Sequence, residues 1–150
     1  MKRLLSLLMC AIIVVSIFPV VGSASVQEQT TIYYADGSYM TVEVDVCKTR
    51  ASGNVTSSKK YTYYDDNNVS QWKAVLYGTF TYTGSSATCT DSSVDVTIYD
   101  SAWYVSSKYA SKSGNTAEAS VTMGHKVAGI TITKVPVNLT LTCDANGNLS

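Results

Sequence analysis

The chain has 150 residues, enough for one domain, and carries 11 basic and 11 acidic residues, so its formal net charge is zero. Apolar residues make up 45% and charged residues only 15%, a composition that excludes a disordered chain. The basic residues form no cluster, which excludes nucleic acid as an expected partner.

The first 24 residues have the pattern of a secretory signal peptide. Lys2 and Arg3 precede an uncharged apolar run over residues 4–18, and small residues follow at 22–25. The run is shorter than the roughly 20 residues of a membrane-spanning helix. We expect cleavage after Ala24 and a secreted, extracellular domain over residues 25–150 with no membrane attachment. A retained N-terminal anchor is the alternative.

The mature sequence alternates apolar and polar residues with a period of two, which predicts β-strands. Asp36-Gly37 predicts a two-residue hairpin turn, and residues 51–54 predict a loop before a short strand over 59–64. The longest predicted strand covers residues 71–83. Its predicted core positions are Trp72, Ala74, Leu76, Gly78, Phe80 and Tyr82.

Further strands are predicted along the rest of the chain. Val94, Val96 and Ile98 alternate with polar residues, and so do the apolar positions between residues 117 and 123. Trp103, Val105, Ser107 and Tyr109 are predicted to share one face. Pro136 is expected to separate a short strand at Ile130 and Ile132 from a last strand that begins at Val137.

Eight or nine short strands at even spacing predict an all-β fold. We expect a single antiparallel β-sandwich, Ig-like in its broad architecture. A small β-barrel is the alternative.

Three cysteines remain after removal of the signal, and a disulfide is permitted outside the cell. Cys143 is in phase with inward-facing leucines, and Cys89 is in phase with Ala87, whereas Cys47 falls on the Glu43 and Asp45 face. This parity favours a Cys89–Cys143 bond with Cys47 as a free thiol. The alternative is that none of the three is paired.

Residues 35–39, 78–89, 111–117 and 141–150, taken with the signal, resemble a family of small secreted proteins of unknown function from Gram-positive bacteria. The resemblance covers most of the mature chain. It implies export and a paired Cys89 and Cys143, and it implies no activity and no catalytic residue.

His125 is the one histidine, and it could serve a hydrolase or act as a base toward Cys47. The sequence has no Gly-x-Ser-x-Gly motif, and one histidine with three scattered cysteines does not supply a zinc site. We therefore expect no enzyme activity, no cofactor and no metal. A small secreted hydrolase using His125 is the alternative.

Tyrosine is the most distinctive residue type, with 11 in the chain. A two-residue turn at Asp36-Gly37 would place Tyr34 opposite Tyr39, and parity turns Tyr77 and Tyr104 outward. Outward aromatic side chains can stack on sugars or anchor a protein partner. The alternative is that such pairs only stabilise the sheet.

The sequence thus predicts a bacterial extracellular binding module, with a glycan or a surface protein as its ligand. The expected protein is a monomer or a Cys47-linked dimer.

Overall fold

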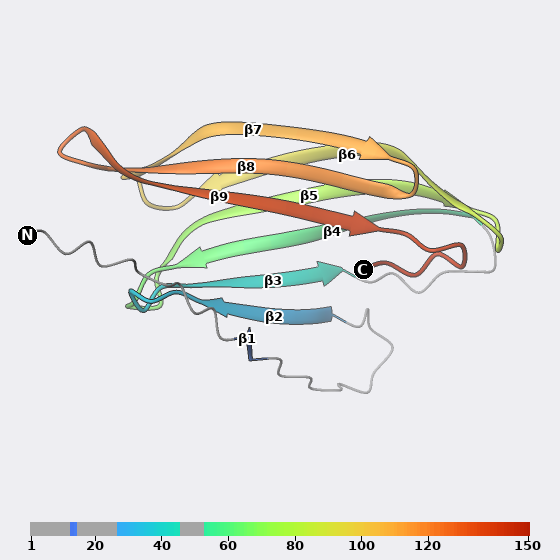
Figure 1. Ribbon diagram of the computed structural model, residues 1–150, viewed down its shortest axis with the longest axis horizontal. Helices are drawn as coiled ribbons and strands as arrows, with labels where there is room; N and C mark the ends of the chain where they lie inside the picture. Colours follow the sequence, from blue (N-terminus) through green and yellow to red (C-terminus); the bar gives the residue numbers. More distant parts are fainter. Residues whose placement is uncertain (1–12, 15–26, 46–52) are drawn as a thin grey trace, which may run out of the picture.

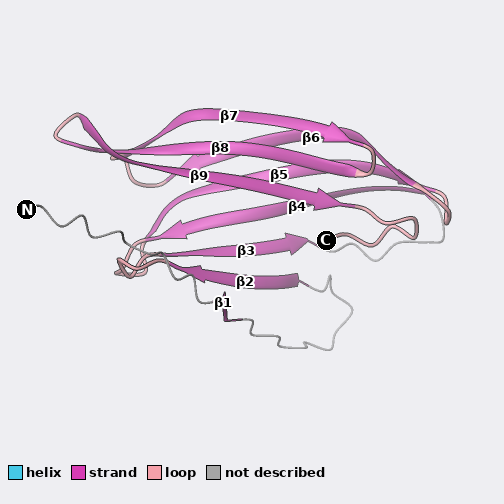
Figure 2. Ribbon diagram, in the orientation of Figure 1, coloured by secondary structure: helices cyan, strands magenta, loops and turns pink. Residues whose placement is uncertain are grey.

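The computed structural model describes residues 13–14, 27–45 and 53–150, and all regular structure within them is β (Figure 2). The strands are β1 (Ile13–Val14), β2 (Gln27–Tyr33), β3 (Tyr39–Asp45), β4 (Gly53–Tyr64), β5 (Ser70–Tyr82), β6 (Ala87–Ile98), β7 (Trp103–Ser113), β8 (Thr116–Val127) and β9 (Ile130–Thr142). Within the described ranges, no helix has the length and apolar character needed to span a membrane.

The strands form two antiparallel sheets. Strands β1 to β6 make the first sheet and β7 to β9 the second, each in sequential order. The second sheet lies over one part of the first, and the two remain separate (Figure 1). The predicted β-sandwich is therefore confirmed. Its sequential strand order means that only the two-layer architecture is shared with immunoglobulin-like domains.

The core lies between the facing sheets, where the period-two pattern directs apolar side chains. The predicted core face of β5 is confirmed, since Trp72, Leu76 and Phe80 are fully buried. The second sheet supplies inward side chains from β8 and β9. These are Ala117, Ala119, Val121, Met123, Val137, Leu139 and Leu141. Burial of these side chains is the main source of the free energy that holds the sheets together.

Two predicted strand boundaries are wrong. Strand β4 begins at Gly53 and runs for 12 residues, so residues 53 and 54 are strand and not loop. Strand β9 continues through Pro136 for 13 residues. Pro136 is tolerated because β9 is an edge strand, where one side of the backbone needs no ladder hydrogen bonds.

The alternation predicted for β7 is interrupted by a β-bulge. Val105 pairs with Met123 whereas Ser107 pairs with Thr122, so two steps along β7 match one step along β8. The bulge changes the face on which later residues lie. Tyr109 is consequently 69% exposed and does not share the buried face of Trp103.

The turn between β2 and β3 is longer than predicted. Tyr33, not Tyr34, pairs with Tyr39. The Tyr34 amide donates a hydrogen bond to the Ser38 carbonyl at 2.9 Å, and Gly37 has the positive φ of 89° that this turn requires. Tyr34 therefore packs against the core and does not join an outward tyrosine pair.

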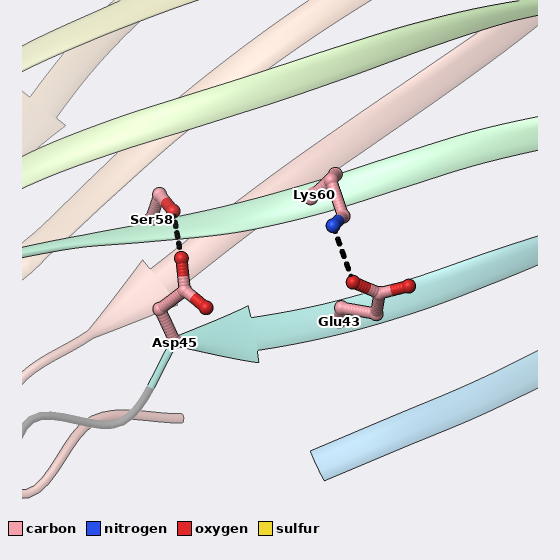
Figure 3. Close-up of polar contacts among 4 residues, drawn as sticks. All are labelled: Glu43, Asp45, Ser58 and Lys60. Atoms are coloured by element: carbon pink, nitrogen blue, oxygen red, sulfur yellow. Dashed lines mark hydrogen bonds and ion pairs between the residues drawn. The ribbon is translucent and has the colours of Figure 1, made fainter. Parts of the chain in front are cut away.

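Polar pairs cover the outward face of β3 and β4 (Figure 3). Lys60 forms an ion pair with Glu43, and the Ser58 hydroxyl donates to the Asp45 carboxylate at 2.7 Å. Such cross-strand pairs each contribute a few tenths of a kcal/mol to about 1 kcal/mol. The outer face of the first sheet is therefore polar here, whereas its inner face is apolar.

The open edge of β6 is covered by side chains from β7. Lys108 donates to the Val94 carbonyl at 3.5 Å, and Lys112 donates to the Thr90 carbonyl. These lysines occupy carbonyl groups that would otherwise be free to pair with another strand.

Gly78 lies at an inward position of β5 where the two sheets approach closely. A Cβ atom there would lie 2.7 Å from the Phe80 ring and 3.0 Å from the Ala117 Cβ in the opposite sheet. We predict that Gly78→Ala lowers the free energy of unfolding by about 1–3 kcal/mol through overpacking. Urea denaturation measures the change.

The matched control is Thr81→Ser on the outward face of β5, which we expect to change stability by less than about 0.5 kcal/mol. An alanine variant at Gly78 as stable as the wild type would contradict the close approach of the sheets.

Candidate functional site

A pocket of about 460 Å³ opens at one end of the sandwich, within the usual size range of ligand sites. The β2–β3, β4–β5 and β6–β7 turns meet there, and part of β8 and β9 forms the opposite wall. The lining residues are Asp36, Ser38, Tyr63, Asp65, Asp66, Gln71, Asp100, Trp103, His125, Ile132 and Thr133.

Local hydrogen bonds within each turn hold the carboxylates at the pocket rim. Asp36 accepts from the Ser38 amide at 3.0 Å and from the Ser38 hydroxyl at 2.6 Å. Asp65 accepts from the Asn67 and Val69 amides at 3.0 and 2.8 Å. These are the Asx-type contacts that make aspartate common in turns. The two turns lie together, since a Cβ on Gly37 would be 3.3 Å from the Asp66 Cβ.

Gln71 joins the second turn to the third. Its side-chain amide donates to the Asp65 carboxylate at 2.9 Å, and its main-chain carbonyl accepts from the Asp100 main-chain amide at 3.1 Å. The Asp100 carboxylate accepts from the Ala102 amide at 2.8 Å. Gln71 is almost fully buried, and these bonds satisfy its side-chain NH2 group and its main-chain carbonyl. They also connect the β4–β5 turn to the β6–β7 turn.

Aromatic rings form the inner wall of the pocket. Trp103 stacks on His125 with ring centroids 4.7 Å apart and meets the Tyr63 ring edge-on at 5.3 Å. Tyr63 in turn stacks on Trp72 at 5.3 Å. The cluster joins β4 and β5 of one sheet to β7 and β8 of the other. The wall of the pocket is therefore continuous with the core.

One indole of the aromatic cluster lacks a hydrogen-bond partner. Among the described residues, the N–H of Trp72 is buried without one, and Trp72 does not line the pocket.

The pocket is electronegative. The lining contains four aspartates and, within the described part of the chain, neither lysine nor arginine. The hydrogen bond from the Ser38 hydroxyl lowers the pKa of Asp36 below its ordinary value of 3.8. Asp36 is therefore ionised at neutral pH, and the site disfavours anions.

The β8–β9 hairpin extends beyond the other turns at this end of the molecule (Figure 1). Val127 pairs with Ile130 near the tip of this hairpin, and Ile132 lines the pocket. Val127, Ile130 and Ile132 are 53%, 69% and 58% exposed. These three residues form an exposed apolar surface beside the acidic rim, which we call the hairpin surface.

The four tyrosines predicted to form one binding surface are dispersed. Tyr39 stacks on Tyr64 at 4.7 Å on the outer face of the first sheet, whereas Tyr77 lies toward the opposite end of that face. Tyr34 points inward toward Tyr63, with ring centroids 6.0 Å apart. Tyr104 belongs to the other sheet.

Tyr104 has a structural role that the sequence did not reveal. Its ring covers Gly124, where a Cβ atom would lie 2.3 Å from the ring. Its hydroxyl is 2.9 Å from that of Thr131, and the Lys126 ammonium lies 4.4 Å from the ring centroid. This tyrosine therefore stabilises the base of the β8–β9 hairpin.

Cys89 and Cys143 are both buried and both thiols in this structure. The β7–β8 turn links them, since the Cys89 amide donates to the Gly114 carbonyl at 2.8 Å and the Cys143 amide to the Asn115 carbonyl at 3.0 Å. Burial raises the pKa of each thiol, and the neighbouring Asp144 and Cys89 raise that of Cys143 further. Cys47 lies outside the described residues.

His125 is placed by stacking rather than by hydrogen bonding. Within the described part of the chain it has no hydrogen bond to a serine, threonine or cysteine that it could activate. Among the same residues, no three metal-binding side chains come together to hold an ion.

The site residues that the sequence analysis missed are mainly the turn aspartates and Trp103. Of the four aspartates, Asp36 was predicted to lie in a turn, and that is correct. Their common signal is that Asp36, Asp65 and Asp100 occur in every second connection between successive strands, and every second connection of an up-and-down chain lies at the same end of the molecule.

We predict that Asp36 contributes to acid sensitivity. Because folding lowers its pKa, its stabilisation is present above pH 3.8 and is lost as the pH falls through the lower folded value. Asp36→Asn should therefore flatten the loss of stability below about pH 4, by less than about 1 kcal/mol at this exposed site. Thermal unfolding across pH 2–6 (roughly the range over which carboxyl groups titrate) measures it.

Ser38→Ala removes the hydroxyl donor and should flatten the same part of the curve. Three parallel curves for the wild type and both variants would contradict the assignment.

In comparisons with known proteins, no family model, curated protein or solved structure matched the chain. The relationship expected from its sequence blocks therefore stays a prediction.

Proposed function

We propose that the protein is an exported, non-catalytic binding module whose ligand site is the pocket at the hairpin end. The observation that supports this best is that three turns, β2–β3, β4–β5 and β6–β7, converge on one cavity with carboxylates at its rim and aromatic rings at its wall. Pre-positioned polar groups beside an apolar wall are typical of ligand sites. The secretion signal expected at residues 1–24 supports an extracellular ligand.

The chemistry of the site supports binding more than turnover. The rim carboxylates of Asp36, Asp65 and Asp100 already accept hydrogen bonds within their own turns. His125 lies flat against Trp103. A ligand that enters meets hydrogen-bond acceptors and ring edges held in position, with little ordering entropy left to lose.

An array of immobilised oligosaccharides and seven-residue peptides tests this proposal. We expect the mature protein to be retained by probes of one class. Asp66→Asn combined with Asp100→Asn should weaken that retention by at least about tenfold, because the loss of even one hydrogen bond to a charged group costs about 1.5–3 kcal/mol.

The matched control is Asp91→Asn with Asp95→Asn, which removes the same charge from exposed positions of β6. Retention equally weak in this control, or unchanged in the pocket variant, would contradict binding at the pocket.

We also propose that Cys89 and Cys143 form a disulfide after export. The turn that holds both backbones supports it, as does the position of Cys89 in β6 of one sheet and of Cys143 directly after β9 of the other. The two thiols would lose two electrons and two protons to a thiol-disulfide oxidant outside the cell. In the chain-entropy account, closing this loop adds about 4 kcal/mol to stability.

Alkylation of the secreted protein in denaturant, without reductant, tests the bond, because denaturation exposes the two buried cysteines. We expect one alkylated thiol, that of Cys47, and none in a Cys47→Ser variant. Three alkylated thiols in the wild type would show that both buried cysteines stay reduced.

A further inference from the structure

Strand β2 lies at the margin of the first sheet, where its outer neighbour among the described residues is the two-residue strand β1 (Figure 1). Both residues of β1 belong to the segment that we expect to be removed on export. We infer that a second copy of the exported chain takes the place of β1, so that two β2 strands pair antiparallel about a two-fold axis. This inference goes beyond the proposed binding function and requires only the removal of residues 1–24.

The pairing with β1 shows which kind of strand this edge accepts. Ile13 lies opposite Ile32 and Val14 lies opposite Thr31, in an antiparallel arrangement. Both residues of β1 are β-branched, a class of residue that is common in strands. Residues 30–32 of β2 are Thr, Thr and Ile, which are β-branched as well. The β2 strand of a second copy is therefore of the kind with which the edge already pairs.

Strand β2 has none of the features that protect strand edges from pairing. Its seven residues include no lysine, arginine, proline or glycine, and it pairs with β3 along its whole length without a bulge. The backbone groups on its other side consequently form a regular row of donors and acceptors. A row of this kind is a template on which a further strand can form hydrogen bonds.

The other marginal strands of the two sheets each carry such a feature. The side chains of Lys108 and Lys112 donate to carbonyls of β6, and Pro136 lies in β9. Strand β7 is also open, but it has a bulge after Val105 and carries the same two lysines. Among the described strands, β2 is therefore the edge best suited to pairing.

A two-fold axis at Thr31 gives a register without charge conflict. Thr31 then lies opposite Thr31 of the second copy, and Ile32 lies opposite Thr30, which are pairs that antiparallel sheets tolerate well. Glu28 is the one charged residue of β2, and it lies outside the paired residues 29–33. Because the same edge is used by both copies, the contact closes on itself and gives a dimer rather than a filament.

Sedimentation velocity of the secreted protein at rising concentration tests the pairing. The Cys47→Ser variant is the parent, so that no disulfide between chains contributes, and its intact mass verifies the N-terminus. We expect a monomer–dimer equilibrium with a dissociation constant on the order of 10 μM or weaker, since one strand pair makes a small interface.

Thr31→Lys in this parent should weaken the dimer at least about tenfold, because two ammonium groups would face each other across the axis. Thr31 lies on the outer face of the first sheet, as Tyr39 does, so the change spares the core. Thr140→Lys, at an exposed position of the edge strand β9, is the matched control and should leave the equilibrium unchanged.

Two further variants test the position of the axis. Thr31→Glu should weaken the dimer as Thr31→Lys does, and an equimolar mixture of the two should restore it, because opposite charges then face each other. Thr31→Cys should give a disulfide-linked dimer on mild oxidation, since opposed Cα atoms in an antiparallel pair are about 4.5–5.5 Å apart, within the range of a disulfide. Thr140→Cys is its control and should stay monomeric.

The remaining outcomes would overturn the inference. These are a parent that stays monomeric at its highest soluble concentration, a dimer that responds equally to Thr31→Lys and Thr140→Lys, and a secreted protein that retains residues 1–24. A dimer weakened by Tyr109→Lys and not by Thr31→Lys would place the contact at β7 and overturn it too. No ligand enters these measurements, so a negative result leaves the binding function of the pocket to its own test.

Discussion

The contact between Tyr63 and Trp103 is the interaction on which both the sandwich and its pocket depend. It joins β4 of one sheet to β7 of the other, and the stacks with Trp72 and His125 extend it in both directions. Large aromatic side chains bury more apolar area than any others. Because this cluster closes the core at the hairpin end, the same rings that stabilise the fold leave their edges at the wall of a cavity. The Tyr63 hydroxyl donates a hydrogen bond to the Ser38 hydroxyl, which donates to the Asp36 carboxylate, so hydrogen bonds connect the core to the rim.

Much of the fold could be predicted because alternation alone decides which face of a strand is buried. Trp72, Leu76 and Phe80 were assigned correctly from their even spacing. The errors arose where a strand departs from a strict period of two or where local signals are ambiguous. The bulge in β7 after Val105 changes the face of Tyr109, and a longer turn moves Tyr33 into the place expected for Tyr34. A proline interrupts a central strand but not an edge strand. Pro136 lies in the edge strand β9, and the alternation of apolar and polar residues does not show which strands are edges.

The site was less accessible to sequence reasoning because its residues come from turns far apart in the chain. Asp36 and Asp100 each have a sufficient local explanation in their own turn. Only the sheet order places those turns at one end of the molecule and sets His125 against Trp103. The number of tyrosines led to the prediction of a tyrosine binding surface. In the structure, however, Tyr104 packs over Gly124 of the β8–β9 hairpin, and Tyr39 stacks on Tyr64 on the outer face of the first sheet. Residue type suggested a binding surface, whereas topology located a pocket elsewhere.

The treatment of the strand edges has a consequence for polymerisation. Lysines from β7 occupy carbonyls of β6, and Pro136 lies in the edge strand β9. Both features block the addition of a further strand. Strand β2 differs, because its outer neighbour is β1, which lies within the expected signal segment. If that segment is removed on export, β2 becomes an open edge of the first sheet, as β7 is of the second, and a strand of another molecule can pair at either edge.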